Sequence, residues 1–137
     1  MAIQTDRIFR IPALRLLEQQ QKHNANVYNY LFDWASPAAG GAMGSPHAIE
    51  LAYVFGTHTK GGAKAFYGEG PKAVDLATMT MTAWAAFAHE AQPGWQAYET
   101  TNRATALLGD SFRQANKPYE AERLAWDGIP DAYLGSL

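Results

Sequence analysis

The residues best suited to chemistry lie between Gly41 and Gly56, where a glycine-rich loop leads to His47 and, three positions later, to Glu50. A histidine titrates near neutral pH, so it can both accept and donate a proton. The loop follows a segment that we expect to be a strand, and functional groups of open α/β sheets collect beyond the carboxyl ends of strands. His47 is therefore the candidate general base, and Glu50 could orient a neighbour or set the local field. The pattern alone also fits a helix-cap histidine beside a solvated glutamate.

A metal site is a second interpretation of the same pair. His47 and Glu50 stand three residues apart, a spacing that some zinc peptidases use. A third ligand would have to come from His58, His89 or Glu69, and none of them has a recognisable spacing. The chain has no cysteine, which excludes disulfides, thiolate metal ligands and a thiol nucleophile. We therefore predict no metal and no cofactor.

Two further histidines are given structural interpretations. His58 stands among small polar residues and Lys60 in a glycine-rich stretch, so we expect it to be a solvated loop residue. His89 lies near the end of an expected helix, where a cation would interact favourably with the helix dipole.

The composition is that of a globular domain. The 137 residues suit one domain, and 47% apolar with 12% aromatic residues excludes a disordered tail. With 13 acidic and 11 basic residues the net charge is −2, so there is no basic footprint for nucleic acid. Charges appear early between Met1 and Arg10, unlike a signal peptide, and the longest uncharged apolar run, Leu76–Ala88, is too short for a bilayer. We expect a soluble, cytoplasmic protein without a membrane partner.

The periodicity of the sequence predicts several helices and one clear strand. We expect a helix over 6–22 that restarts at Pro12, a short helix from Pro46 to Gly56, and a loop over 57–71. A long helix is expected over 75–90, with an apolar stripe that includes Trp84 and Phe87. A small antiparallel pair formed by 95–98 and 104–108 and a last helix over 120–126 complete the predicted elements.

The clear strand covers residues 26–34, and its aromatic side chains alternate onto one face. A lone strand leaves backbone donors and acceptors unpaired, which is costly if they are buried. Helices and loops of this chain, a second chain or a larger α/β fold must therefore supply its neighbours.

Several motifs resemble the carboxylesterase type B family, the branch of α/β-hydrolases that includes the cholinesterases. The family pattern Gly-x-x-His-x-x-Glu-Leu-x-Tyr-Val-Phe-Gly matches Gly44–Gly56, and its Tyr-x-Tyr-x-Phe-x-Trp-x-Ser-Pro pattern matches Tyr28–Pro37. Shorter matches occur at Asp6, Phe9, Pro12 and Ala13, at Trp84, Phe87 and Ala88, at Pro93, Trp95 and Tyr98, and at Trp126 and Asp127. The chain departs from the family at 89–91 and in the variable stretch 57–71.

The resemblance implies that residues 1–137 form a single partial α/β domain, the carboxy-terminal portion of an α/β-hydrolase fold. It would be rich in helices, with one long strand and a short hairpin. His47 would be the triad histidine of a serine esterase, Glu50 a supporting buried acid, and the substrate an uncharged carboxylic ester.

The nucleophile elbow, the triad acid and the oxyanion-hole glycines of that family are absent from the sequence. None of the serines, at positions 36, 45, 111 and 136, stands in Gly-x-Ser-x-Gly. The expected partner is thus a serine-bearing amino-terminal esterase portion or a second copy of the chain. The alternative function is a catalytically inactive remnant or oligomerising module.

Overall fold

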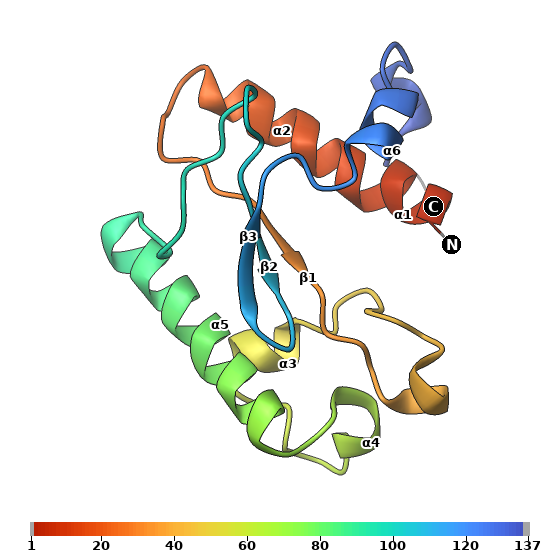
Figure 1. Ribbon diagram of the computed structural model, residues 1–137, viewed down its shortest axis with the longest axis vertical. Coiled ribbons are helices and arrows are strands. Elements are labelled where there is room, and N and C mark those ends of the chain that lie inside the picture. The colour runs from red at the N-terminus through yellow and green to blue at the C-terminus, as the bar shows by residue number, and fades with distance from the viewer. Residues whose placement is uncertain (1, 136–137) are drawn as a thin grey trace. The chain divides into compact units, whose positions relative to one another are not determined.

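The computed structural model describes residues 2–135 and divides the chain into two compact units. Within these residues, the first unit comprises 2–29, 96–105 and 115–135, and the second comprises 30–95 and 106–114 (Figure 1). We describe each unit by itself.

The first unit is built around an amino-terminal run of helix. Its helical elements are α1 (Ala2–Thr5), a π-helical turn (Asp6–Arg10), α2 (Ile11–Gln21), α6 (Glu120–Ala125) and a 3-10 turn (Asp131–Tyr133). The expected restart at Pro12 is confirmed, because Pro12 is the second residue of α2. Proline lacks an N–H and crowds the preceding turn, which explains why a wider π turn comes directly before it.

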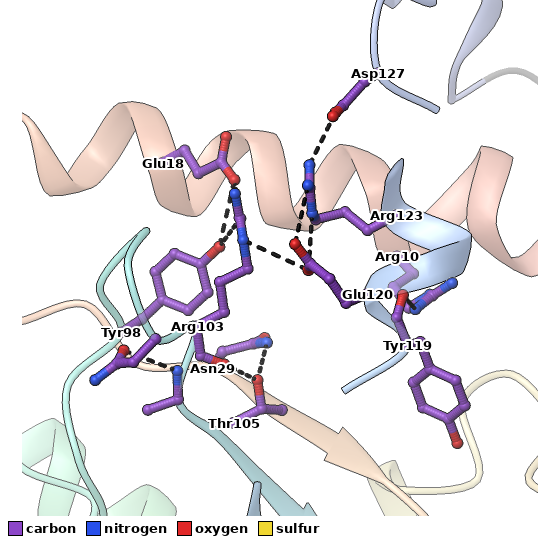
Figure 2. A network of polar contacts seen from close by, with 12 residues as sticks. Arg10, Glu18, Asn29, Tyr98, Arg103, Thr105, Tyr119, Glu120, Arg123 and Asp127 are labelled. Atoms are coloured by element: carbon purple, nitrogen blue, oxygen red, sulfur yellow. Dashed lines mark hydrogen bonds and ion pairs between the residues drawn. The ribbon is translucent and has the colours of Figure 1, made fainter. Parts of the chain in front are cut away.

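A network of charged side chains joins the segments of the first unit (Figure 2). The Arg103 guanidinium contacts the Glu18 carboxylate of α2, donates to the Tyr98 hydroxyl at 2.7 Å, and lies 3.7 Å from the Glu120 carboxylate of α6. Arg123 holds the same Glu120 at 2.9 Å. Because Arg103 is largely buried, its charge depends on these partners for stabilisation.

A three-stranded sheet and three helices make up most of the second unit. The elements are β1 (Tyr30–Phe32), a 3-10 turn (Ala38–Gly41), α3 (Leu51–Val54), α4 (Lys64–Tyr67), α5 (Pro71–Glu90), β2 (Thr105–Leu108) and β3 (Phe112–Ala115). The strand order is β1-β2-β3, with β1 and β2 parallel and Phe32 opposite Leu108. Only three residues join β2 to β3, so these two strands must be antiparallel.

One hydrophobic core holds the helices and the sheet of the second unit together. Its most buried members come from β2, α3, α5 and the segments beside them, and they are Trp34, Ile49, Tyr53, Ala73, Leu76, Ala77, Ala106 and Leu108. Tyr30 and Phe32 pack against this core, as the aromatic alternation predicts. Within residues 2–135, even the 20-residue α5 lacks the apolar length that a membrane crossing requires.

The strand predictions needed two corrections. The strand over 26–34 was predicted too long, because only Tyr30–Phe32 is paired. The antiparallel pair of 95–98 with 104–108 was wrong: 95–98 is not a strand, and β2 instead pairs with β1 and β3. This arrangement supplies one of the two neighbours that the aromatic strand lacked.

The helix predictions were right in type and inexact in their ends. The long helix begins at Pro71 rather than near residue 75, because Gly70 and Pro71 form its start. The loop over 57–71 contains α4, and the short helix before Gly56 is regular only in α3. Of the expected apolar stripe on α5, Trp84 and Phe87 remain exposed.

Candidate active site

The candidate site is built at the carboxyl ends of the two parallel strands. The backbone N–H of Asp33, directly after β1, donates to the Leu108 carbonyl at 2.6 Å. Gly109 directly follows β2, and a Cβ at this position would lie 2.8 Å from the Asp33 carbonyl oxygen. Glycine is therefore required by the close approach of these two backbone segments. This is the edge of a parallel sheet at which ligands commonly bind.

Two serines fix the loop that leaves β1. The Ser45 hydroxyl donates to the Phe32 carbonyl at 2.9 Å. This hydrogen bond holds the carboxyl-terminal end of the loop against the carboxyl end of β1. Ser36 is fully buried; its N–H donates to the Gly44 carbonyl at 2.8 Å, and its hydroxyl donates to the Phe66 carbonyl at 2.6 Å. Ser45 before Pro46 resembles a helix N-cap, and neither serine was predicted to anchor the loop in this way. A serine just after a strand and one just before a proline are weak signals of it.

His47 and Glu50 occupy one turn between this anchored loop and α3. His47 is exposed, Glu50 is half-buried, and Ile49 between them is only 1% exposed. The resemblance implied a buried acid at position 50, and Glu50 is half-buried and less exposed than His47. Ala48 has φ 65°, in the left-handed region that costs a non-glycine residue about 1–2 kcal/mol. Burial of Ile49 holds the turn in this conformation and presents the His47 side chain at the surface.

Tyr30 of β1 lies within the electrostatic reach of Glu50. Burial raises the pKa of the Tyr30 phenol, and the negative charge of Glu50 raises that pKa further. The Tyr30 ring packs edge-on against Trp84 and Trp95, each with a centroid separation of 6.4 Å. The aromatic alternation of the strand predicts which face Tyr30 occupies, but no sequence pattern indicates its proximity to Glu50.

The expectation for His58 was wrong. His58 is 6% exposed, and its ring stacks on Tyr53. The Ala52 carbonyl accepts hydrogen bonds from the N–H groups of both Thr57 and His58, at 2.7 and 3.1 Å. These bonds turn the chain back over α3 and bury the imidazole. His89 is exposed in the last turn of α5, as expected.

The metal interpretation lacks a third ligand. In the part of the chain that the structure describes, no three His, Cys, Asp or Glu side chains are grouped closely enough to hold an ion. The turn presents an exposed imidazole, the half-buried Glu50 carboxylate follows three residues later, and the half-buried Tyr30 phenol lies within the electrostatic reach of that carboxylate. Such an imidazole can transfer protons to and from a nucleophile presented opposite it.

Known proteins similar to this chain include several esterases. A family model described as the carboxylesterase family matches residues 1–126. Among curated proteins, the chain is 32% identical to the para-nitrobenzyl esterase of Bacillus subtilis (strain 168) in an alignment of 128 positions that covers 87% of this chain and 25% of that protein. It is 28% identical to the phenmedipham hydrolase of Pseudarthrobacter oxydans over 113 residues, covering 77% of this chain and 23% of that protein.

Solved structures give the same result. A carboxylesterase of Geobacillus stearothermophilus superposes with a TM-score of 0.79 at 29% identity, covering 92% of this chain and 27% of that chain. A structure named PNB esterase gives a TM-score of 0.73 at 27% identity, covering 90% of this chain and 26% of that one. The chain thus spans about a quarter of the length of its relatives, and the expected fold class, a partial α/β-hydrolase segment, is confirmed. With nearly all of its length matched by one family model, the chain belongs to the carboxylesterase family.

Proposed function

We propose that this chain is the histidine-bearing portion of a serine carboxylesterase, with His47 as the general base and acid. The observation that carries the proposal is the position of His47. It lies on an anchored turn at the carboxyl ends of β1 and β2, in a chain whose relatives include named esterases. The substrate class is an uncharged carboxylic ester.

The proposed reaction needs His47 twice. His47 accepts the proton of a serine hydroxyl as the serine oxygen attacks the ester carbonyl, and the imidazolium then gives that proton to the departing alcohol. In the second half, His47 accepts a proton from water as the water attacks the acyl-enzyme, and returns it to the serine oxygen. Glu50, half-buried one turn away, supports the imidazolium through its negative charge.

The serine, the triad acid and the oxyanion donors would come from a serine-bearing esterase portion. Two features of the second unit support such a partner. In the described sheet β1 has a strand neighbour on one side only, and parallel strands are usually buried on both faces and edges. Large apolar side chains are also exposed on α3 and α5 and beside them, among them Phe55 at 72% exposed, Trp84 and Phe87.

The same surface favours a second candidate function, a non-catalytic module that associates with itself. Two copies could pair their β1 edges about a two-fold axis. Light scattering distinguishes the two candidates, because the module would be a stable dimer alone, whereas the esterase portion would form a 1:1 complex with the serine-bearing portion.

Complementation tests the catalytic proposal. This chain is mixed with a separately produced serine-bearing portion of the Bacillus subtilis para-nitrobenzyl esterase, and hydrolysis of para-nitrophenyl acetate is followed. We expect saturable hydrolysis with the unmodified chain and with His89→Ala, the control at another exposed histidine. His47→Ala should reduce the rate at least about a thousandfold. Equal hydrolysis by the His47→Ala mixture would refute the assignment.

A further inference from the structure

A buried histidine outside the proposed catalytic turn has no hydrogen-bond partner. Both ring nitrogens of His58 are inaccessible to solvent and unpaired among the described residues. The imidazole stacks face to face on the Tyr53 ring, with a centroid separation of 5.0 Å and an interplanar angle of 9°. A buried polar group without a partner costs free energy, so its presence at this position calls for an explanation.

The surroundings of His58 tolerate only the neutral imidazole. The titratable group on its stacking partner is the Tyr53 phenol, which donates to the Tyr67 carbonyl, and neither group carries a charge. Burial lowers the pKa of the His58 imidazole.

Glu50, half-buried at the opposite end of α3, is the least exposed carboxylate near this helix, and the other charged groups named here on adjoining segments are exposed. Lys60 and Asp75 are exposed, and two exposed ion pairs join Lys64 to Glu69 at 3.2 Å and Lys72 to Asp110 at 2.9 Å. An imidazolium at this position would therefore be both desolvated and unpaired.

The stack on Tyr53 connects His58 to the turn that carries His47. Tyr53 is fully buried in α3, and the N–H groups of Tyr53 and Val54 both donate to the Glu50 carbonyl at 2.9 Å. The other end of α3 is closed by the two hydrogen bonds from Thr57 and His58 to Ala52. Loss of the His58 stack would therefore release α3 at its carboxyl end and loosen the turn at its amino end.

We propose that His58 is an acid-sensitive latch on α3: protonation of its buried imidazole opens the segment 51–58 and with it the turn that carries His47. The inference that the segment 51–58 opens depends only on contacts within the second unit. Its consequence for ester hydrolysis, a loss of activity on acidification that His58→Phe would not show, rests on the proposed function.

Amide hydrogen exchange at pH 7.5 and pH 5.5, corrected for the intrinsic pH dependence of exchange, tests the latch in the intact chain. The ordinary histidine pKa is about 6.5, so the opening equilibrium of the Tyr53 to His58 amides should rise by up to about tenfold at the lower pH. His58→Phe keeps a ring on Tyr53 and cannot be protonated, so it should abolish the rise. His58→Leu, a second variant that cannot be protonated, should also abolish the rise of the opening equilibrium. His89→Phe, the same substitution at an exposed histidine, should leave that rise intact.

Two results would overturn the latch: an unchanged opening equilibrium in the unmodified chain, or an equal rise in His58→Phe. The titration of the His58 ring protons by NMR in the unmodified chain adds a readout that needs no variant. A midpoint at or above the ordinary histidine value would contradict the proposal. Because neither measurement requires esterase activity, failure of the latch and failure of the proposed function are separable.

Discussion

Removing the Tyr53 hydroxyl should invert the stability order of wild type and variant as the pH rises. Tyr53 is fully buried, and its hydroxyl donates to the Tyr67 carbonyl. In Tyr53→Phe that carbonyl remains paired, because the Trp34 indole N–H also donates to it at 2.7 Å. The ring contacts with Phe32, Trp34 and His58 are kept. At pH 7 the variant should therefore lose only the net value of one hydrogen bond, about 1 kcal/mol.

At alkaline pH, wild type loses stability because the buried Tyr53 phenol resists ionisation. Burial is the main cause that raises the pKa of the Tyr53 phenol, from 10.0 to about 12. A group whose pKa is raised in the folded state stabilises that state fully below the unfolded pKa, and the stabilisation is lost as pH rises through the folded pKa. For wild type alone this loss is about 1 kcal/mol at pH 11 and about 2 kcal/mol at pH 12. The two proteins should be equally stable near pH 11, and Tyr53→Phe should be the more stable above it.

Urea unfolding followed by tryptophan fluorescence between pH 7 and pH 11.5 measures this difference. Other buried tyrosines also titrate in this range, but they are common to both proteins and cancel in the difference. If the difference in the free energy of unfolding between wild type and Tyr53→Phe stays constant from pH 8 to pH 11.5, ionisation of the Tyr53 phenol does not destabilise the fold. A loss of more than about 3 kcal/mol at pH 7 would instead show that the Tyr67 carbonyl depends on the hydroxyl alone.

Three further predictions concern the charged network, the strand ends and the turn that carries His47. Arg103→Met removes the centre of the charged network in the first unit and should lower the free energy of unfolding by about 3 kcal/mol in chemical denaturation; a loss under 1 kcal/mol would mean that solvent screens these pairs. Gly109→Ala forces a Cβ toward the Asp33 carbonyl oxygen and should cost about 1–3 kcal/mol in the same assay, whereas a neutral result would contradict the close approach of the strand ends. Because His47 is exposed and Glu50 half-buried, His47→Ala should change the melting temperature less than Glu50→Ala does, and the reverse order would refute our description of the turn.

Local patterns in the sequence predicted the parts of the fold that depend on nearby residues. Aromatic alternation identified the face of β1 that packs on the core, and helical periodicity found α2, α5 and α6. The start of α5 was predicted at residue 75, four residues too late, although the glycine and proline at positions 70 and 71 carried the stronger start signal. Local patterns could not show that β2 pairs with β1, because that pairing joins residues more than 70 positions apart and depends on packing.

The turn that carries His47 was found through its motif, whereas its supports were not. Ser36 and Ser45 act through backbone carbonyls of distant residues, and no side-chain pattern records such contacts. His58 was misjudged for a related reason: its polar neighbours suggest solvent exposure, but the two hydrogen bonds to Ala52 determine its burial. Backbone hydrogen bonds of this kind depend on where the chain returns, not on residue type.

The way this turn is supported explains why a catalytic role for His47 would be separable from stability. The loop is held by serine hydrogen bonds to the end of β1 and by burial of Ile49, and these supports do not involve the His47 side chain. The cost of the left-handed Ala48 backbone is met by the contacts around it. The same arrangement makes the turn sensitive to α3, because the Glu50 carbonyl accepts the hydrogen bonds that begin this helix. Control of the site through Tyr53 and His58 would therefore act on the backbone position of His47.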